Sequence, residues 1–257
     1  MSRHRFYAPP AEITGSSITL SPDESHHLSR VLRLRPGDQV SVFDGVGSEY
    51  TCKVSHSSGS RVVLEIIGQL TDQVESPLNL TLAQALVKGE KFDFIVQKAT
   101  ELGVSRIVPI VTEHSDVRIA DEKADRRLGR WRRVALEALK QCGRRVLLQI
   151  EPPQPFTEFL HCENPQSDDR TSGEVALMLA FTESGGASID SLLAEHRGGA
   201  PVTAVIGPEG GWSDAELRSM AEFGCHSVTL GRRILRTETA SVVAIALIQH
   251  ALGDLSR

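Results

Sequence analysis

Features that define a membrane-spanning, secreted or metal-binding protein are missing from this sequence of 257 residues. It has no run of about 18 apolar residues, the length that spans a bilayer, and its amino terminus, MSRHRFYAPP, lacks the apolar core of a signal peptide. The four cysteines stand far apart, without CxxC spacing or a nearby pair of histidines. We therefore expect a cytoplasmic protein with free thiols, no disulfide framework, no metal site and no membrane partner.

The usual nucleotide-binding fingerprints are also missing. Neither GxxxxGK[ST] nor GxGxxG occurs, which disfavours a nucleoside triphosphate or a dinucleotide as ligand. Gly45-Val46-Gly47 is half of a dinucleotide fingerprint, but it links two expected strands instead of opening a helix. We reject it as a cofactor loop.

The charge is unevenly distributed. A formal net charge of -5 argues against a generally cationic nucleic-acid binder. Residues 118–145 nevertheless carry ten basic and four acidic side chains, a local net charge of +6. The segment fits either a surface that binds RNA phosphates or a solvated helix face with ion pairs between residues four apart.

Residues 1 to about 70 predict a small β-rich domain. Ser21, Pro22 and Glu24 form a helix start, which predicts a helix through Leu28 and Leu32. The alternating segments 39–43, 49–54 and 61–67, separated by glycine-containing turns, predict a meander or a small barrel.

Three arginines of this domain are candidates for contact with phosphates. Arg30, Arg33 and Arg35 project from the expected helix and its end. The neighbouring His26 and His27 fit capping or core packing better than metal ligation, since no further ligand stands at a suitable spacing.

The pattern changes after a polar linker at residues 69–76. Apolar strands then alternate with helices, as in a parallel α/β sheet. The expected strands are 78–86, 107–111, 175–180, 202–206 and 228–230, and the expected helices are 92–102, 121–142, 189–194, one that opens at a capping box at residue 213, and 240–252. Residues 163–173 are expected to form a surface loop.

Two glycine-bearing loops follow the last two strands. Glycine lets a ligand approach the backbone closely, and free amides at a helix start bind acceptor atoms. In the first loop, Glu209 would repel a triphosphate but suits a cationic ligand or a ribose hydroxyl. In the second, Ile234 and Leu235 could line a flat apolar group, whereas Arg236 and Glu238 fit either catalysis or a structural ion pair.

The two loops also carry a resemblance to a known family. IGPEGGW at 206–212 and LGRRILRTETA at 230–240 resemble the signature of the SPOUT RNA methyltransferases. Within these, the sequence is similar to the RsmE family, which makes 3-methyluridine in small-subunit (16S) ribosomal RNA. The segments RFY at 5–7, HHLSRVLRLRPGD at 26–38, QKATELGV at 97–104 and QCGR at 141–144 resemble the same family.

The resemblance implies an α/β protein with two domains. Residues 1–72 would form a PUA-like RNA-binding β-barrel, and residues 76–257 a SPOUT domain with a trefoil knot at about 202–252. The protein would be a homodimer acting on 16S rRNA, within the small ribosomal subunit. Its methyl donor would be S-adenosyl-L-methionine, with no metal, and the implied donor-binding residues are Phe181, Gly207, Pro208, Glu209, Gly210, Gly211, Leu230, Gly231, Ile234, Leu235 and Thr239.

Transfer of a methyl group to uracil N3 also requires loss of the N3 proton. Arg236 would stabilise negative charge on the uracil carbonyl oxygens, and Glu238 or a water would take part in deprotonation or orient the arginine. The expected RNA-binding residues are Arg5, Arg30, Arg33, Arg35, Arg126, Arg130 and Arg144. Two alternatives stay open: a knotted methyltransferase acting on another RNA or atom, and a non-catalytic RNA-binding ribosome assembly factor.

Overall fold

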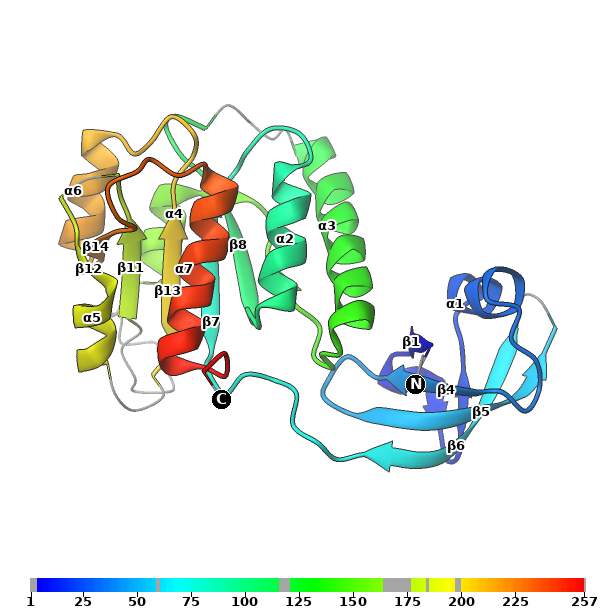
Figure 1. Cartoon of the computed structure of the whole chain (residues 1–257). Helices are drawn as coiled ribbons and strands as arrows, with labels where there is room; N and C mark the ends of the chain where they lie inside the picture. The colour runs from blue at the N-terminus through cyan, green and yellow to red at the C-terminus, as the bar shows by residue number, and fades with distance from the viewer. Residues whose placement is uncertain are drawn as a thin grey trace. The chain divides into compact units, whose positions relative to one another are not determined.

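The computed structural model describes residues 4–58, 61–115, 121–163, 177–183, 185–196 and 200–256, with side chains for all of them except residues 121–123 and 195. The chain forms two compact units (Figure 1). One consists of the residues up to Glu75 together with Leu139–Leu147, and the other of Ser76–Ala138 together with the residues from Leu148 onward.

The N-terminal unit is built on one sheet with strand order β1-β4-β5-β6-β3-β2. Strands β4, β5 and β6 form the predicted antiparallel meander. The edge strands β1 and β2 do not pair with each other in the described residues, so the predicted PUA-like barrel is a curled, open sheet. Its elements are β1 (Arg5–Tyr7), η1 (Pro10–Glu12), β2 (Ile13–Thr14), β3 (Ser17–Thr19), α1 (Pro22–His26), η2 (His27–Val31), β4 (Gln39–Phe43), β5 (Glu49–Ser57) and β6 (Val62–Leu70).

Local sequence signals explain how this unit is shaped. The Ser21 side chain accepts a hydrogen bond from the backbone N–H of Glu24, which caps α1 as predicted. Gly45 has φ +81°, and a Cβ there would come within 2.9 Å of Leu147 and of Tyr7. This glycine therefore allows a turn and a close approach of the chain, a structural role.

Residues 139–147 join the N-terminal unit through a buried charged cluster, here called the Glu49 cluster and made of Arg5, Glu49 and Arg145. Glu49 accepts from Arg5 Nε and from Arg145 Nε, each at 2.9 Å. Arg145 Nη2 also lies 2.7 Å from Asp72 Oδ1. Burial alone would raise the pKa of Glu49, but the hydrogen bonds and positive charges of the two arginines outweigh it and lower that pKa.

The C-terminal unit is a parallel sheet with strand order β10-β8-β7-β13-β11-β14-β12, and β9 pairs with β8. The predicted alternation of strands and helices is confirmed. The elements are β7 (Leu80–Ala85), α2 (Lys91–Glu101), β8 (Arg106–Val111), α3 (Asp121–Cys142), β9 (Gln149–Ile150), β10 (Gln154–Pro155), α4 (Phe156–Cys162), β11 (Leu177–Phe181), β12 (Ala187–Ser188), α5 (Ile189–Glu195), β13 (Val202–Ile206), α6 (Asp214–Glu222), β14 (His226–Thr229) and α7 (Thr237–Leu252).

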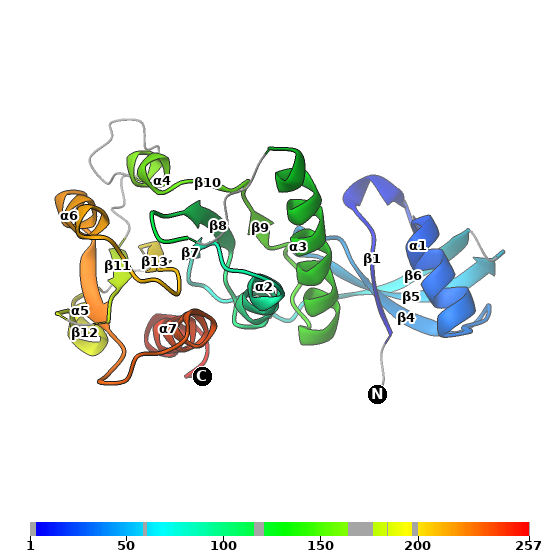
Figure 2. The same cartoon turned by 90° about the horizontal axis from the view of Figure 1, so that it is seen from above.

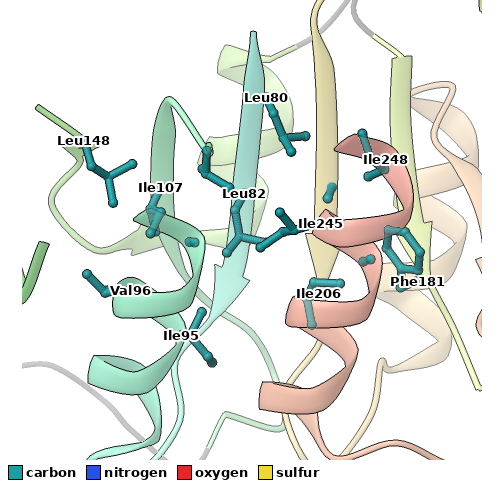
Figure 3. Packing of buried hydrophobic residues seen from close by; sticks show 14 of the residues in the cluster. Leu80, Leu82, Ile95, Val96, Ile107, Leu148, Phe181, Ile206, Ile245 and Ile248 are labelled. Carbon is teal, nitrogen blue, oxygen red and sulfur yellow. The ribbon is translucent and has the colours of Figure 1, made fainter. Parts of the chain in front are cut away.

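Helices cover both faces of this sheet. Helices α2, α5 and α7 lie on one face and α4 and α6 on the other (Figure 2). Along β7, Leu80 and Leu82 point into the larger core with Ile95 of α2 and Ile245 of α7 (Figure 3). Ala83 belongs to the core on the opposite face, as the two-residue period of a strand requires.

Some expectations fall partly or wholly outside the described residues. The predicted loop 163–173, the first residues of the strand predicted at 175–180, and Arg118 at the start of the basic segment are among them. The last helix begins at Thr237, three residues before its predicted start. Within the described ranges, no helix has the length and apolar character needed to cross a membrane.

Candidate active site

A cavity of about 740 Å³ lies at the carboxyl ends of β11, β13 and β14. The register places Phe181 of β11 beside Ile206 and Val228, so the three parallel strands end at the same edge. Ligands of open α/β sheets bind at this edge, and the volume suits a small organic molecule. The two predicted glycine loops line the cavity.

The indole of Trp212 holds the beginning of the first loop. Its Nε1 donates to the carbonyl of Phe181 at 3.0 Å, which links the ends of two neighbouring strands. A Cβ on Gly207 would come within 2.9 Å of the same indole. Glycine is therefore required at position 207 for this packing.

The end of the first loop is held by His114. Its Nδ1 lies 3.1 Å from the carbonyl oxygen of Gly210 and 3.2 Å from that of Gly211, so the ring donates to the loop when Nδ1 carries the proton. A Cβ on Gly210 would come within 2.9 Å of the His114 Cβ, and Gly211 has φ +71°. Glycine at position 210 thus allows the close approach of His114, and glycine at position 211 allows the positive φ.

The loop continues into α6 through the predicted capping box. Ser213 accepts from the backbone N–H of Glu216, and the Glu216 side chain accepts from that of Ser213. Before the box, the Glu209 carboxylate forms an ion pair with Lys91, at the start of α2. Glu209 and Lys91 both line the cavity, so charges of both signs face it.

The second loop leads into α7. Gly231 has φ +87°, which favours glycine, and Ile234 is 76% exposed although it lines the cavity. The Thr237 hydroxyl donates to the carbonyl of Gly207 at 2.8 Å. This bond ties the first turn of α7 to the start of the first loop.

Most predicted donor-binding residues line the cavity together. They are Phe181, Gly207, Pro208, Glu209, Gly210, Gly211, Leu230, Gly231, Ile234 and Leu235, joined by the predicted catalytic residue Arg236. Thr239 is exposed and does not line it. Glu238 does not line it either, and its Oε2 is buried with no hydrogen-bond partner among the described residues.

Sequence reasoning missed part of the lining. The residues not foreseen are Lys91, Thr182, Glu183, Ile206, Trp212, Leu217, Arg233, Thr237 and Ala240. Trp212 and Thr237 stand inside the two quoted segments, so the loops themselves could have indicated them. Lys91 gave no local signal, because it comes from a helix more than 100 residues away in the chain.

The predicted RNA-binding arginines fall into two groups. Arg30, Arg33, Arg35 and Arg126 are exposed, and Arg130 pairs with Asp93 on α2. The side chains of Arg5 and Arg144, in contrast, bond to other groups of the N-terminal unit.

Arg5 donates to Glu49 and to the carbonyl oxygens of Leu139 at 2.7 Å and of Arg144 at 3.0 Å. Arg144, 6% exposed, donates from Nε to Glu75 at 2.8 Å. This geometry gives both arginines a structural role, and a contact with phosphate would require these bonds to break.

Two of the four cysteines have a raised pKa. All four cysteines are free, as predicted, and burial raises the pKa of Cys52 to about 12 and that of Cys225 to about 11. These two thiols therefore stay protonated at neutral pH. The described residues contain no group of three or more histidine, cysteine or acidic side chains that could hold a metal ion.

Models of two known domains match this chain. An RNA methyltransferase domain matches residues 74–249, and an RNA methyltransferase PUA domain matches residues 20–67. The chain thus has the two domains of an RNA methyltransferase that carries a PUA domain.

Three similar proteins narrow the class to a family. The ribosomal RNA small subunit methyltransferase E of Synechocystis is 33% identical over 251 residues, which cover 97% of this chain and 78% of the relative. The protein of the same name from Bacillus subtilis is 30% identical, and the match covers 95% of this chain and 91% of that relative. The crystal structure of the Neisseria gonorrhoeae enzyme of that name, bound to S-adenosyl methionine, is 34% identical with a TM-score of 0.85 and covers 98% and 99% of the two chains. The chain belongs to the ribosomal RNA small subunit methyltransferase E (RsmE) family, as its loops predicted.

Proposed function

We propose that this protein transfers a methyl group from S-adenosyl-L-methionine to N3 of a uridine in 16S rRNA. The observation that carries the proposal is the cavity at the ends of β11, β13 and β14, bounded by the two loops that mark the family. The SAM-bound Neisseria gonorrhoeae relative, which matches nearly the full length of this chain, supports the choice of donor.

The residues of the cavity fit this donor. Ile206, Leu230 and Leu235 supply apolar surface, and the glycine backbone of both loops presents polar groups at close range. Glu209 supplies a carboxylate suited to the positive sulfonium or to ribose hydroxyls. When bound, the donor supplies an electrophilic methyl group.

Arg236 is the residue proposed to act on the acceptor base. It is exposed and lines the cavity at the end of the second loop, so its guanidinium can reach a base that enters there. There it stabilises the negative charge that uracil carbonyl oxygens gain as N3 loses its proton. Glu238, or a water, accepts that proton or orients Arg236.

The remaining proposals concern domains and partners. Residues 1–72 act as the PUA-like domain and 76–257 as the SPOUT domain, except that residues 139–147 belong to the N-terminal unit. The knot at about 202–252 is proposed from family membership. RNA phosphates of the small subunit are bound by Arg30, Arg33, Arg35 and Arg126. Because the proposed substrate is ribosomal RNA, we expect the protein to act in the cytoplasm. The protein works as a homodimer, supported by the exposure of Leu247 on the apolar helix α7 and of Ile234.

Two measurements test this function. Calorimetric titration with S-adenosyl-L-methionine should show binding, and its absence would exclude the proposed donor. A modified-nucleoside profile of rRNA from a deletion strain should lack 3-methyluridine in 16S rRNA. Loss of a different methylated nucleoside would favour a knotted methyltransferase of other specificity, and an unchanged profile an assembly factor.

The role of Arg236 is tested by single-turnover methylation with donor and RNA saturating. Arg236→Ala should lower the rate by about 100-fold, the usual cost of losing one group that stabilises a developing oxyanion. Arg232→Ala is the control, since it removes the same charge from the same loop at a position that does not line the cavity. A rate for Arg236→Ala equal to that of the control would exclude the role.

A further inference from the structure

A buried network of neutral hydrogen bonds lies where β7 meets the first turn of α7. It is made of Gln84, Thr237 and Ser241, which are 0%, 5% and 0% exposed, and is here called the Gln84 network. Gln84 Nε2 donates to Thr237 Oγ1 at 3.1 Å, and Ser241 Oγ donates to Gln84 Oε1 at 2.5 Å. Thr237 Oγ1 in turn donates to the carbonyl of Gly207 at 2.8 Å.

The donors and acceptors fix the orientation of Gln84 and Thr237, whereas the Ser241 hydroxyl lies within hydrogen-bond distance of both Gln84 Oε1 and the Thr237 carbonyl, the latter at 2.8 Å. The Thr237 proton is used by the Gly207 carbonyl, so this hydroxyl can only accept from Gln84. The second N–H of the Gln84 amide donates to the carbonyl of Ala85 at 3.1 Å. A flipped amide would set two oxygens against each other there, so the Gln84 amide has one orientation.

The network joins the two loops at the edge of the sheet. Gln84 pairs in register with Ile206, the residue directly before Gly207 and the first loop. Thr237 directly follows Arg236, the last residue of the second loop. One chain of hydrogen bonds thus sets the Gly207 carbonyl and the backbone of Arg236 relative to each other.

We propose that Gln84 and Ser241 are positioning residues for methyl transfer, acting through the Thr237 hydroxyl. This inference rests on the proposed function, because it assigns the alignment of donor and acceptor base to the network. Neither Gln84 nor Ser241 lines the cavity, so neither touches the ligand directly. They act by holding Gly207 on the donor side and Arg236 on the acceptor side.

The chemistry of the reaction makes such positioning important. Methyl transfer requires the sulfonium methyl and the attacking nitrogen to lie in line, and a displacement of about 1 Å can cost about 100-fold in rate. A neutral network adds no charge next to a cationic donor. The hydrogen bonds of the Gln84 network themselves do not depend on an ionisable side chain.

The test replaces hydroxyls while keeping side-chain shape. In Thr237→Val the Gly207 carbonyl and the Gln84 amide both lose their partner, and we expect the single-turnover rate at saturating donor and RNA to fall at least about tenfold. Thr237→Ser keeps the hydroxyl and should stay within about threefold of the wild-type rate. Thr100→Val is the matched control, because Thr100 is equally buried in α2, donates to Val96 and does not line the cavity.

Ser241→Ala extends the test to a residue that does not touch the cavity. It should lower the rate at saturating donor and RNA by more than Thr100→Val does. Its melting temperature should stay above the assay temperature, so that the variant is folded when the rate is measured. Wild-type rates in Thr237→Val and Ser241→Ala would overturn the inference and leave the proposed function intact. Absence of donor binding by the wild-type protein would overturn the proposed function, and this role with it.

Discussion

The Glu49 cluster and the Gln84 network do the same kind of work with different chemistry. Each joins segments far apart in the chain. Glu49, Arg145 and the three side chains of the Gln84 network are buried, and Arg5 is 11% exposed. The Glu49 cluster uses two guanidinium groups around one carboxylate, whereas the Gln84 network uses one amide and two hydroxyls.

The difference teaches where charge is tolerated. Buried charges are costly to take out of water, and losing one partner leaves the others uncompensated, so a charged cluster holds its partners firmly but depends on pH. A neutral network is weaker and does not titrate. The charged one fastens a chain segment in the N-terminal unit, and the neutral one lies beside the cavity of the C-terminal unit.

The largest expected effect comes from removing the centre of the charged cluster. Glu49→Ala should destabilise the N-terminal unit by about 3–5 kcal/mol, because the buried Arg145 and the largely covered Arg5 would lose their shared partner. Hydrogen exchange of amides in β4 and β5 measures this directly. Glu65→Ala, an exposed change on the neighbouring strand β6, is the control, and equal protection in the two variants would contradict the prediction.

A smaller effect is expected in the neutral network. Ser241→Ala removes the hydroxyl donor of the buried Gln84 Oε1, which should cost about 1–3 kcal/mol. Because none of the three side chains titrates, the loss measured by urea unfolding should be the same at pH 6 and pH 8. A cost that changes across this range would show that charged groups are involved.

Low pH should weaken the Glu49 cluster but not the Gln84 network. Since the pKa of Glu49 is lowered from its ordinary value of 4.5, its stabilising contribution is fully present above about 4.5 and is lost as the pH falls through the lowered pKa. Exchange protection of β4 and β5 in the wild-type protein should therefore decrease in that window. Glu49→Gln, which cannot ionise, should lack this part of the decrease, and identical profiles would refute the assignment.

The smallest effect is expected at the ion pair beside the cavity. Lys91 and Glu209 are 38% and 46% exposed, so solvent screens their attraction. A double-mutant cycle with Lys91→Met and Glu209→Gln, measured on the free energy of unfolding, should give a coupling energy of at most about 1 kcal/mol between the two side chains. This coupling energy should decrease as the salt concentration rises. A larger coupling would mean that the pair behaves as a buried one.

Elements with strong local patterns could be predicted from the sequence. The bounds of β4 and β13 agree with the predictions, and so does the capping box at Ser213. Each depends on side-chain alternation or on residues a few positions apart. The two cavity loops were found for the same reason, since glycines and a following helix start stand together in the chain.

Long-range partners could not be predicted in this way. Arg5 was expected to contact RNA, but its partners at residues 139–144 stand more than 130 positions away, and no local pattern indicates them. Lys91 was missed for the same reason. The two-residue strands β9, β10 and β12 are too short to show alternation, and α4, with seven residues, was also missed.

The membership of residues 139–147 in the N-terminal unit bears on how this protein can be divided. The chain changes unit after residues 75, 138 and 147, so the N-terminal unit is not one continuous stretch of sequence. A gene fragment that ends at residue 75 would encode Glu49 without Arg145, and Arg5 without the carbonyl oxygens that it binds. Recombination that exchanges this domain between relatives must therefore carry a second, internal piece of the gene along with the first.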